Sequence, residues 1–300
     1  MAQFGLHAAL VTALPSNPIG DDCIRFLRGY RVDTSLIQRR GERIGIYFLE
    51  AGANQRPSQV IYDRAHSAIA EANADSFDWD AIFDGASWLH VTGITPAISQ
   101  SAADLTLTAV QKAQAHNVTI SCDTSYRSKL WQYGKRPIQV MPHIAQYVNM
   151  LFANREDCQL SYGVQLSEAE AEGLSEAEQN QRIAEKMFAT FPQLCYQVFT
   201  HREGFSASHN AWQASLYNSR SFITSRRYDI THIVDRVGGG DALVAGLIYG
   251  LSTGMSDEES LEFAAAAACL KHTIPGDINL VSVAEIKQLR KEDVSGRVQR

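Results

Sequence analysis

The sequence predicts an α/β protein of three layers, in which a mainly parallel β-sheet carries helices on both faces. Short apolar runs recur along the chain with helical stretches between them, a pattern typical of parallel strands joined by crossover helices. Most of these runs also lead directly into a polar residue. The runs are Ala8–Thr12, Trp88–Val91, Val118–Cys122, Tyr147–Phe152 and Tyr196–Phe199.

Polar residues stand where the predicted strands end. Thr92, Asp123, Asn154 and Thr200 follow or close four of the runs. In parallel sheets, ligands bind beyond the carboxyl ends of the strands, so these four side chains are expected to line one crevice. The alternative is that they are turn residues or helix caps, as residues at strand ends commonly are.

Two of the intervening segments have helical character. In Ala102–His116 the leucines and Val110 recur at helical spacing, which predicts a helix packed on the sheet. Ser167–Phe191 begins with a series of glutamates and continues as an amphipathic pattern. We expect it to form one solvated surface helix without a chemical role.

A β-hairpin is predicted where the strand–helix alternation is interrupted. The segments Arg43–Glu50 and Gln59–Ala65 have no helix between them and are joined by residues 51–58. Alternate residues of a strand share a face, so Tyr62 and Arg64 point the same way. A hairpin inserted into an α/β domain at 43–65 is a candidate lid, and a plain extension of the sheet edge is the alternative.

Composition and charge narrow the class of protein. The 300 residues carry 27 Lys and Arg against 33 Asp and Glu, a formal charge of −6 without a polybasic run, which argues against nucleic-acid or anionic-membrane partners. The longest apolar run, Phe263–Leu270, is far shorter than the ~20 residues that span a bilayer. The N-terminus lacks a signal-peptide pattern. Five widely spaced cysteines without a Cys-x-x-Cys predict reduced thiols in a cytoplasmic protein, with neither a zinc site nor a disulfide framework.

The most informative motif is Asp235-Arg-Val-Gly-Gly-Gly-Asp241, which precedes a helix predicted over Ala242–Leu251. A helix N-terminus offers unpaired N–H groups and about half a positive charge, and glycines let a phosphate approach the backbone. A carboxylate beside such a site can accept a proton from a substrate hydroxyl. The motif therefore combines the two parts that phosphoryl transfer needs, a positioned base and dipoles for the transferring group.

Other glycine-rich sites fit this stretch less well. The chain has no Gly-x4-Gly-Lys-[Ser/Thr], so the motif is not a P-loop. Gly238-x-Gly240-x-x-Leu243 lacks the third small residue of a dinucleotide-binding fingerprint and lies late in the chain. A glycine-rich turn capped by an aspartate is the remaining structural alternative.

The motif and the following Ala-Leu-Val-Ala-Gly resemble the C-terminal signature of the ribokinase-like (PfkB) carbohydrate kinases, and Arg236 is typical of their 2-keto-3-deoxygluconate kinase branch. The resemblance extends from residue 4 to about residue 285. It includes Gly45–Glu50 and Ile61–Ala65, which resemble the lid of that branch, and Asp123–Trp131, which resembles its Asp-x-Asn-x-Arg-x-x-Leu-Trp. The resemblance implies a ribokinase-like fold, with residues 1–300 forming one kinase domain and a small β lid.

The resemblance also implies roles for individual residues. Asp241 would be the general base, and the backbone of Gly238, Gly239 and Gly240 would form the anion hole. The remaining candidates are Tyr47, Tyr62, Arg64, Arg127 and Asp277 for the sugar acid, Asn154, Thr200, Arg202 and Gly204 for the nucleotide, and Asp157 for the metal. Two arginines suit a sugar acid, since guanidinium groups bind carboxylates bidentately. Lys271 and His272 are expected only to cap the alanine-rich helix before them.

The sequence departs from the family pattern in three places. Ser125 replaces the usual asparagine, and Asp157 replaces the usual glutamate, which keeps the charge but shortens the reach. The family's first strand and its Gly-Gly-x-x-x-Asn turn have no counterpart here, which is expected to expose an edge of the sheet and to remove part of the sugar pocket.

These observations predict an ATP- and Mg²⁺-dependent kinase that converts 2-keto-3-deoxygluconate to its 6-phosphate. One alternative is a kinase for a neutral sugar such as fructose or ribose on the same fold. Another is a truncated, non-catalytic relative, because of the departures from the pattern. The expected partners are the sugar acid and ATP, and a homo-oligomer formed through the lid is a further possibility.

Overall fold

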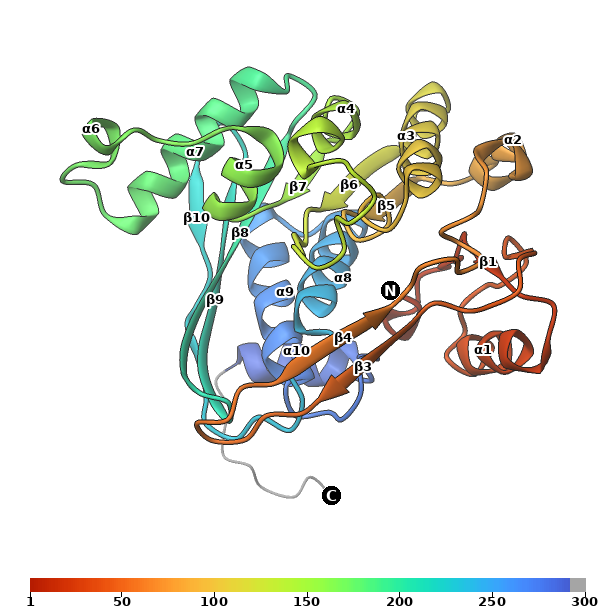
Figure 1. Cartoon of the computed structure of the whole chain (residues 1–300). Coiled ribbons are helices and arrows are strands. Elements are labelled where there is room, and N and C mark those ends of the chain that lie inside the picture. Colours follow the sequence, from red (N-terminus) through yellow and green to blue (C-terminus); the bar gives the residue numbers. More distant parts are fainter. Residues whose placement is uncertain (292–300) are drawn as a thin grey trace.

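A computed structural model describes residues 1–291, and the predicted domain reaches residue 300, so its last nine positions lie outside the described residues. A seven-stranded sheet lies at the centre, in the order β10-β9-β8-β7-β6-β5, with β11 also paired to β9 (Figure 1). Strands β5 to β8 are parallel, and β8 to β11 add antiparallel pairs at one side. The strands are β5 (Trp88–Thr92), β6 (Thr119–Asp123), β7 (Met150–Phe152), β8 (Tyr196–Ser206), β9 (His209–Tyr217), β10 (Phe222–Thr224) and β11 (Tyr228–Ile230).

Helices cover both faces of this sheet, so the predicted three-layer α/β class is confirmed (Figure 1). On one face lie α3 (Gln100–Ala115), α4 (Met141–Ala145), α5 (Arg155–Tyr162) and α7 (Glu176–Thr190), and on the other α8 (Gly239–Ser252), α9 (Asp257–Lys271) and α10 (Val283–Arg290). Each face has its own apolar core. Leu151 and Met187 are fully buried on the α7 side, and Leu247 and Phe263 on the α8 side.

The small residues of α8 bring it close to α9. A Cβ at Gly246 would lie 2.7 Å from the Cα of Ala264, and one at Gly250 would lie 2.6 Å from the Oγ of Ser260. No side chain fits in either gap. The two helices therefore form a tightly packed pair beneath the sheet, and α8 begins at the glycine motif.

The N-terminal segment stands beside the main sheet. It contains η1 (Ala2–Phe4), β1 (Ala13–Leu14), α1 (Pro18–Gly29) and β2 (Gln38–Arg39), and β1 pairs with β2 in parallel. The strand predicted over Ala8–Thr12 is wrong. These residues are half-buried or exposed, and they make backbone hydrogen bonds to residues 33–38 and an isolated bridge between Ala9 and Asp33. Strand pairing begins only beyond them, at β1, which pairs with β2 outside the main sheet. Among the described residues, β5 pairs only with β6 and forms the edge of the sheet.

The acidic segment Ser167–Phe191 is also different from the prediction, because it forms two helices. These are α6 (Glu168–Ala171) and α7, separated by a turn at Gly173, whose φ is +74°. Ser167 and Ser175 each accept a hydrogen bond from the N3 amide and pair with a glutamate at N3. Two capping boxes therefore start two helices where a single one was expected.

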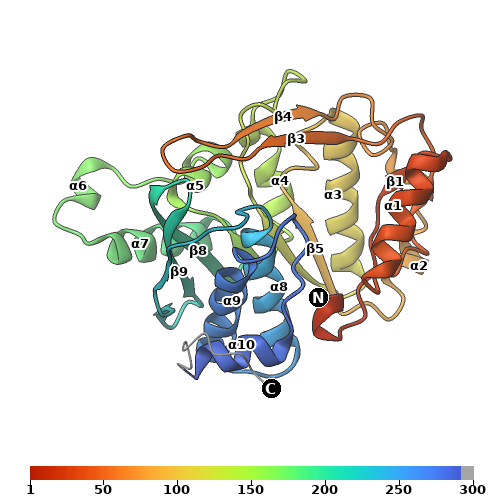
Figure 2. The same ribbon diagram turned by 90° about the horizontal axis from the view of Figure 1, so that it is seen from below.

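The hairpin stands apart from the main sheet and crosses above it (Figure 2). It consists of β3 (Ile46–Glu50) and β4 (Gln59–Asp63), antiparallel, with Tyr47 opposite Tyr62. The remaining short elements are η2 (Ala74–Ser76), α2 (Trp79–Phe83) and η3 (Pro137–Gln139). Over residues 1–291, none of the helices combines the length and the apolar character needed to cross a membrane.

Candidate active site

The three glycines before and at the start of α8 have different reasons to be glycine. Gly238 is the N-cap, with φ of +81°, and a Cβ there would lie 2.2 Å from the carbonyl oxygen of Asp277. A Cβ at Gly239 would lie 3.0 Å from the Cε1 of His272. Gly240 has nothing within 4 Å of that point, so it leaves open space above the N-terminus of α8. The turn is thus packed from below and open above, as an anion site at a helix N-terminus requires.

Asp241 lies in the first turn of α8 and is accessible to solvent. The surrounding protein still raises the pKa of its carboxyl above the ordinary value, mainly through burial and then through the negative charge of Asp277. Arg127 and Lys271 act in the opposite direction and favour the ionised carboxylate. A carboxylate with an elevated pKa is a better proton acceptor as long as it stays ionised.

Asp235 and Arg236 hold the glycine turn in place. The carboxylate of Asp235 accepts hydrogen bonds from the backbone N–H of Val237 at 3.0 Å and of Gly276 at 2.9 Å. Arg236 donates to the carbonyl oxygens of Ser206 and Ala207 at the end of β8, and to the Oδ1 of Asn210 at 3.0 Å. The turn is therefore tied both to the loop after α9 and to the β8–β9 connection.

Asp123 and Arg127 approach the same point from the end of β6. Asp123 is half-buried, and the pKa of its carboxyl is raised to about 6, mainly by burial and in part by Asp241, while Arg127 acts in the opposite direction. Arg127 follows β6 in an irregular segment and not on a helix, and its Nη1 donates to the carbonyl of Tyr126 at 2.8 Å. The structure therefore brings Asp123, Arg127 and Asp241 into electrostatic contact.

The inner face of the hairpin is turned toward Asp241 and Asp277. The guanidinium of Arg64 lies 5.7 Å from the ring centroid of Tyr47 and 5.6 Å from that of Tyr62. Burial and then the charge of Asp277 raise the pKa of Tyr47, and Asp241 contributes in the same direction. Tyr47, Tyr62 and Arg64 thus form one cluster that faces the residues around the glycine turn.

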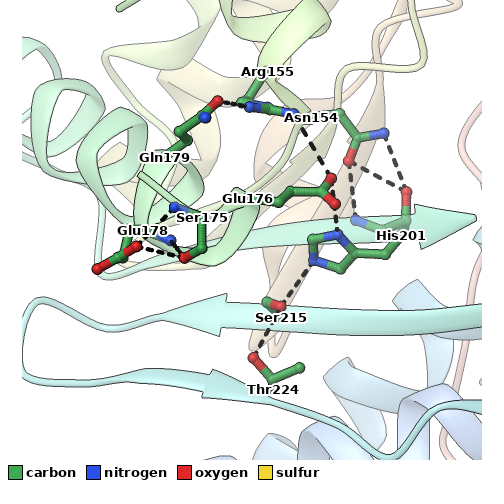
Figure 3. A network of polar contacts seen from close by, with 10 residues as sticks. Asn154, Arg155, Ser175, Glu176, Glu178, Gln179, His201, Ser215 and Thr224 are labelled. Carbon is green, nitrogen blue, oxygen red and sulfur yellow. Dashed lines mark hydrogen bonds and ion pairs between the residues drawn. The ribbon is translucent and has the colours of Figure 1, made fainter. Parts of the chain in front are cut away.

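Asn154, just after β7, and Thr200, in the middle of β8, form a second polar cluster (Figure 3). Asn154 accepts a hydrogen bond from the N–H of Thr200 at 2.9 Å and donates to its Oγ1 at 3.2 Å. Asp157 accepts from the N–H of Asn154 at 3.0 Å and of Tyr126 at 3.4 Å, and so caps α5. Arg202 and Gly204 lie further along β8 and are exposed. Burial raises the pKa of Asp157 despite these two backbone donors.

His201 links this cluster to α7. Its ring contacts Glu176 at 3.6 Å and the hydroxyl of Ser215 at 2.9 Å (Figure 3). A cavity of about 980 Å³ opens here, lined by residues from α5, α7, β8 and β9 that include Asn154, Thr200 and Arg202. Three of the four predicted nucleotide residues therefore line one concave surface.

Lys271 and His272 were not expected in the site, and the structure places both beneath the glycine turn. His272 does cap α9 as predicted, because its Nδ1 bonds to the carbonyl of Ala268 at 2.7 Å. Lys271 is fully buried, and its Nζ donates to the carbonyl of Ile274 at 3.0 Å. A lysine inside the apolar pattern of a helix was the one available sequence signal, since lysine is almost never fully buried without a partner.

Comparison with known proteins identifies the family. The model of the pfkB family carbohydrate kinases matches residues 1–191 and 211–283. The chain belongs to this family. It is thus a carbohydrate kinase, and the predicted ribokinase-like fold and phosphotransferase class are confirmed.

Three relatives illustrate where this kinase lies within the family. The 2-dehydro-3-deoxygluconokinase of Thermotoga maritima is 44% identical, with a TM-score of 0.89 over 97% of this chain and 85% of that chain. A PfkB family carbohydrate kinase from Listeria grayi is 30% identical, with a TM-score of 0.87 over 97% and 87%. The 2-dehydro-3-deoxygalactonokinase of Haloferax volcanii is 28% identical over 295 residues, which are 98% of this chain and 85% of the relative.

Proposed function

We propose that this kinase transfers the γ-phosphoryl group of ATP to the terminal hydroxyl of a 2-keto-3-deoxy sugar acid, preferably 2-keto-3-deoxygluconate, to give its 6-phosphate. The observation that carries the proposal is the placement of Arg64 and Arg127 around the crevice that holds Asp241. Two guanidinium groups near one crevice suit a substrate with a carboxylate, because they bind it bidentately. The names of the relatives from Thermotoga maritima and Haloferax volcanii support the same substrate class.

Asp241 is the proposed general base. Its carboxylate would accept the proton of the attacking hydroxyl, while the backbone N–H groups of Gly238, Gly239 and Gly240 hold the transferring phosphoryl group. The open space above Gly240 and the tight packing below Gly238 support this division of roles. Because the base must be ionised, activity should fall as the pH drops through its raised pKa.

Asn154, Thr200, Arg202 and Gly204 are proposed to bind the nucleotide. The first three line the cavity at the end of β8, and Asn154 is held in position by its two hydrogen bonds with Thr200. Among residues 1–291, no group of three or more His, Cys, Asp or Glu is placed to hold a metal. Mg²⁺ would therefore take most of its ligands from the nucleotide phosphates, with Asp157 as its protein neighbour, and when bound it would neutralise phosphate charge.

The sugar acid is proposed to lie between the hairpin and the glycine turn. Tyr47, Tyr62 and Arg64 would contact it from the hairpin, and Arg127 and Asp277 from the main body. The segment 43–65 would then act as a lid on the single kinase domain. The electrostatic contact of Tyr47 with Asp277 and Asp241 supports this closure over the crevice.

A substrate comparison tests the proposal. We expect kcat/KM for 2-keto-3-deoxygluconate to exceed the value for fructose and ribose by at least about 10²-fold, as for a site built around a charged group. The galactonate epimer should be measured alongside, because one relative is named for it. A preference for fructose or ribose would establish a neutral-sugar kinase, and no turnover with any acceptor would point to a non-catalytic relative.

We also propose a homo-oligomer formed through the outer face of the hairpin. Ile46, Phe48 and Ile61 lie on this face and are 40%, 57% and 65% exposed. A second copy would cover this apolar surface. A cytoplasmic location is proposed as well, supported by the five cysteines, which are all free thiols.

A further inference from the structure

The buried lysine at the end of α9 has no part in the roles proposed above. Lys271 is fully buried, and its side chain passes beneath the glycine turn. A Cβ at Gly238 would lie 3.1 Å from the Cε of Lys271. The Nζ donates to the carbonyl of Ile274 at 3.0 Å. A buried ammonium group is costly unless charges of opposite sign compensate it.

Three carboxylates provide part of that compensation, although burial outweighs them and lowers the pKa of Lys271. Asp235, Asp241 and Asp277 all interact electrostatically with Lys271 and favour its charged form, while burial acts against it. Asp235 and Asp277 belong to the two segments that meet at Gly238. The ammonium group therefore lies beneath the place where the motif and the loop after α9 join.

We propose that Lys271 is a positioning residue: its buried ammonium group holds the loop 272–277 against the glycine turn and places a positive charge beneath the N-terminus of α8, where Asp241 lies. The inference rests on the proposed role of Asp241 as the base. It goes beyond that role, since it names the group that supports the turn and the loop beside the base.

The charges around Asp241 act in both directions. Burial and Asp277 raise the pKa of Asp241, and Lys271 and Arg127 lower it. Arg127 is exposed and follows β6, so solvent screens it, whereas Lys271 is enclosed. The other titratable groups in electrostatic contact with Asp241 or Lys271 are Tyr47, Asp123, Asp235 and His272.

The loop after α9 shows the second half of the role. The N–H of Ile274 donates to the carbonyl of Lys271 at 3.0 Å, and the N–H of Val234 donates to that of His272 at 2.8 Å. With the bond from Lys271 to Ile274, these contacts wrap the loop around the ammonium group. The loop then presents the carbonyl of Asp277 against Gly238.

Two substitutions separate charge from hydrogen bonding. Lys271→Gln keeps an N–H donor for the carbonyl of Ile274 but removes the charge, and Lys271→Arg keeps the charge. Lys112→Gln, on the exposed side of α3, is the matched control. The pKa of Asp241 is measured by NMR titration of ¹³C-labelled aspartate carboxyls, with the signal assigned from the Asp241→Asn spectrum.

We expect Lys271→Gln to raise the pKa of Asp241 by about one unit, the usual effect of losing a nearby opposite charge. The acidic limb of the pH profile of kcat/KM should move by the same amount, while Lys271→Arg and Lys112→Gln leave both unchanged. In a Lys271→Ala variant, propylammonium should restore activity and propanol, which is similar in shape but neutral, should not.

Two results would overturn the proposal. One is a lower kcat in Lys271→Gln at every pH with the titration of Asp241 unchanged, which would mean a purely structural role. The other is a shifted pKa of Asp241 in Lys271→Arg, because that variant keeps the positive charge. This result decides the question even if Lys271→Gln does not fold. The NMR titration needs no turnover, so it separates this inference from the proposed function. If the proposed function failed, phosphorylation would be absent while the shift in the pKa of Asp241 would still be seen.

Discussion

The glycine turn before α8 and the β3–β4 hairpin face each other across the crevice, but they are held in different ways. The turn rests on the paired helices α8 and α9, whose contact at Gly246 and Ala264 leaves no room for a side chain. The hairpin projects from the main sheet with an exposed outer face, and its hydrogen bonds to the main body include one from Lys129 to Val60 and one from Ala207 to Asn54. The proposed chemistry thus belongs to the core, and much of the proposed substrate recognition belongs to a projecting hairpin.

This contrast gives an order to the expected effects of substitution. Changes at the glycines of the turn should act on the chemical step and on folding together, because the same packing serves both. Changes on the inner face of the hairpin should act mainly on substrate binding. Changes on its outer face should affect association between copies and leave the other two properties largely intact.

The largest effect is expected at Asp241. Replacing it with Asn removes the proposed base but keeps the size of the side chain, so kcat should fall by about 10²–10⁴-fold. Steady-state kinetics at saturating substrate measures this loss, and the thermal midpoint should stay close to that of the unchanged protein. A near-normal kcat would remove Asp241 from the role of base.

Gly238→Ala is expected to damage both stability and activity. An alanine with φ near +81° costs about 1–2 kcal/mol, and its Cβ would also meet the carbonyl of Asp277. We expect the thermal midpoint to fall by at least about 4 °C, together with kcat. Gly240→Ala is the matched control for packing, because nothing lies within 4 Å of its Cβ position. Equal losses of stability in both variants would contradict the packing argument.

Arg64→Ala and Arg127→Ala test the hairpin side of the comparison. If both guanidinium groups bind the carboxylate in the ground state and the transition state alike, their loss should raise KM more than it lowers kcat. Each loss should cost about 2–5 kcal/mol where the contact is desolvated, and less where water enters. The ratio of kcat/KM for 2-keto-3-deoxygluconate over fructose should fall in both variants. An unchanged ratio in both would remove the main support for a sugar acid.

The smallest effect on catalysis is expected on the outer face of the hairpin. Phe48→Ser should weaken the proposed association between copies, which light scattering coupled to size-exclusion chromatography would measure as a lower mass. Phe26→Ser, at an exposed phenylalanine of α1, is the control and should leave the mass unchanged. A wild-type protein that is monomeric at high micromolar concentration would refute the proposed interface.

Sequence patterns predicted much of this architecture because they are local. The strand–helix alternation predicted β5 to β8, and the glycine motif predicted the start of α8. Local patterns also misled in two places. Ala8–Thr12 is apolar but lacks a neighbouring strand of the main sheet, and the acidic segment contains two serine caps that divide it into two helices.

The sequence by itself determined the glycine turn, the carboxylate beside it and the polar ends of the strands, since each depends on residue types at fixed short spacing. Only the tertiary structure decided what surrounds Asp241. The contact of Gly238 with Asp277, the hydrogen bonds from Arg236 to the end of β8, and the burial of Lys271 join segments that lie dozens of residues apart. Sequence periodicity shows the face on which a residue lies but not its partner. A lysine at the end of an alanine-rich helix therefore predicts a cap. In the fold, Lys271 is instead an enclosed cation among three carboxylates.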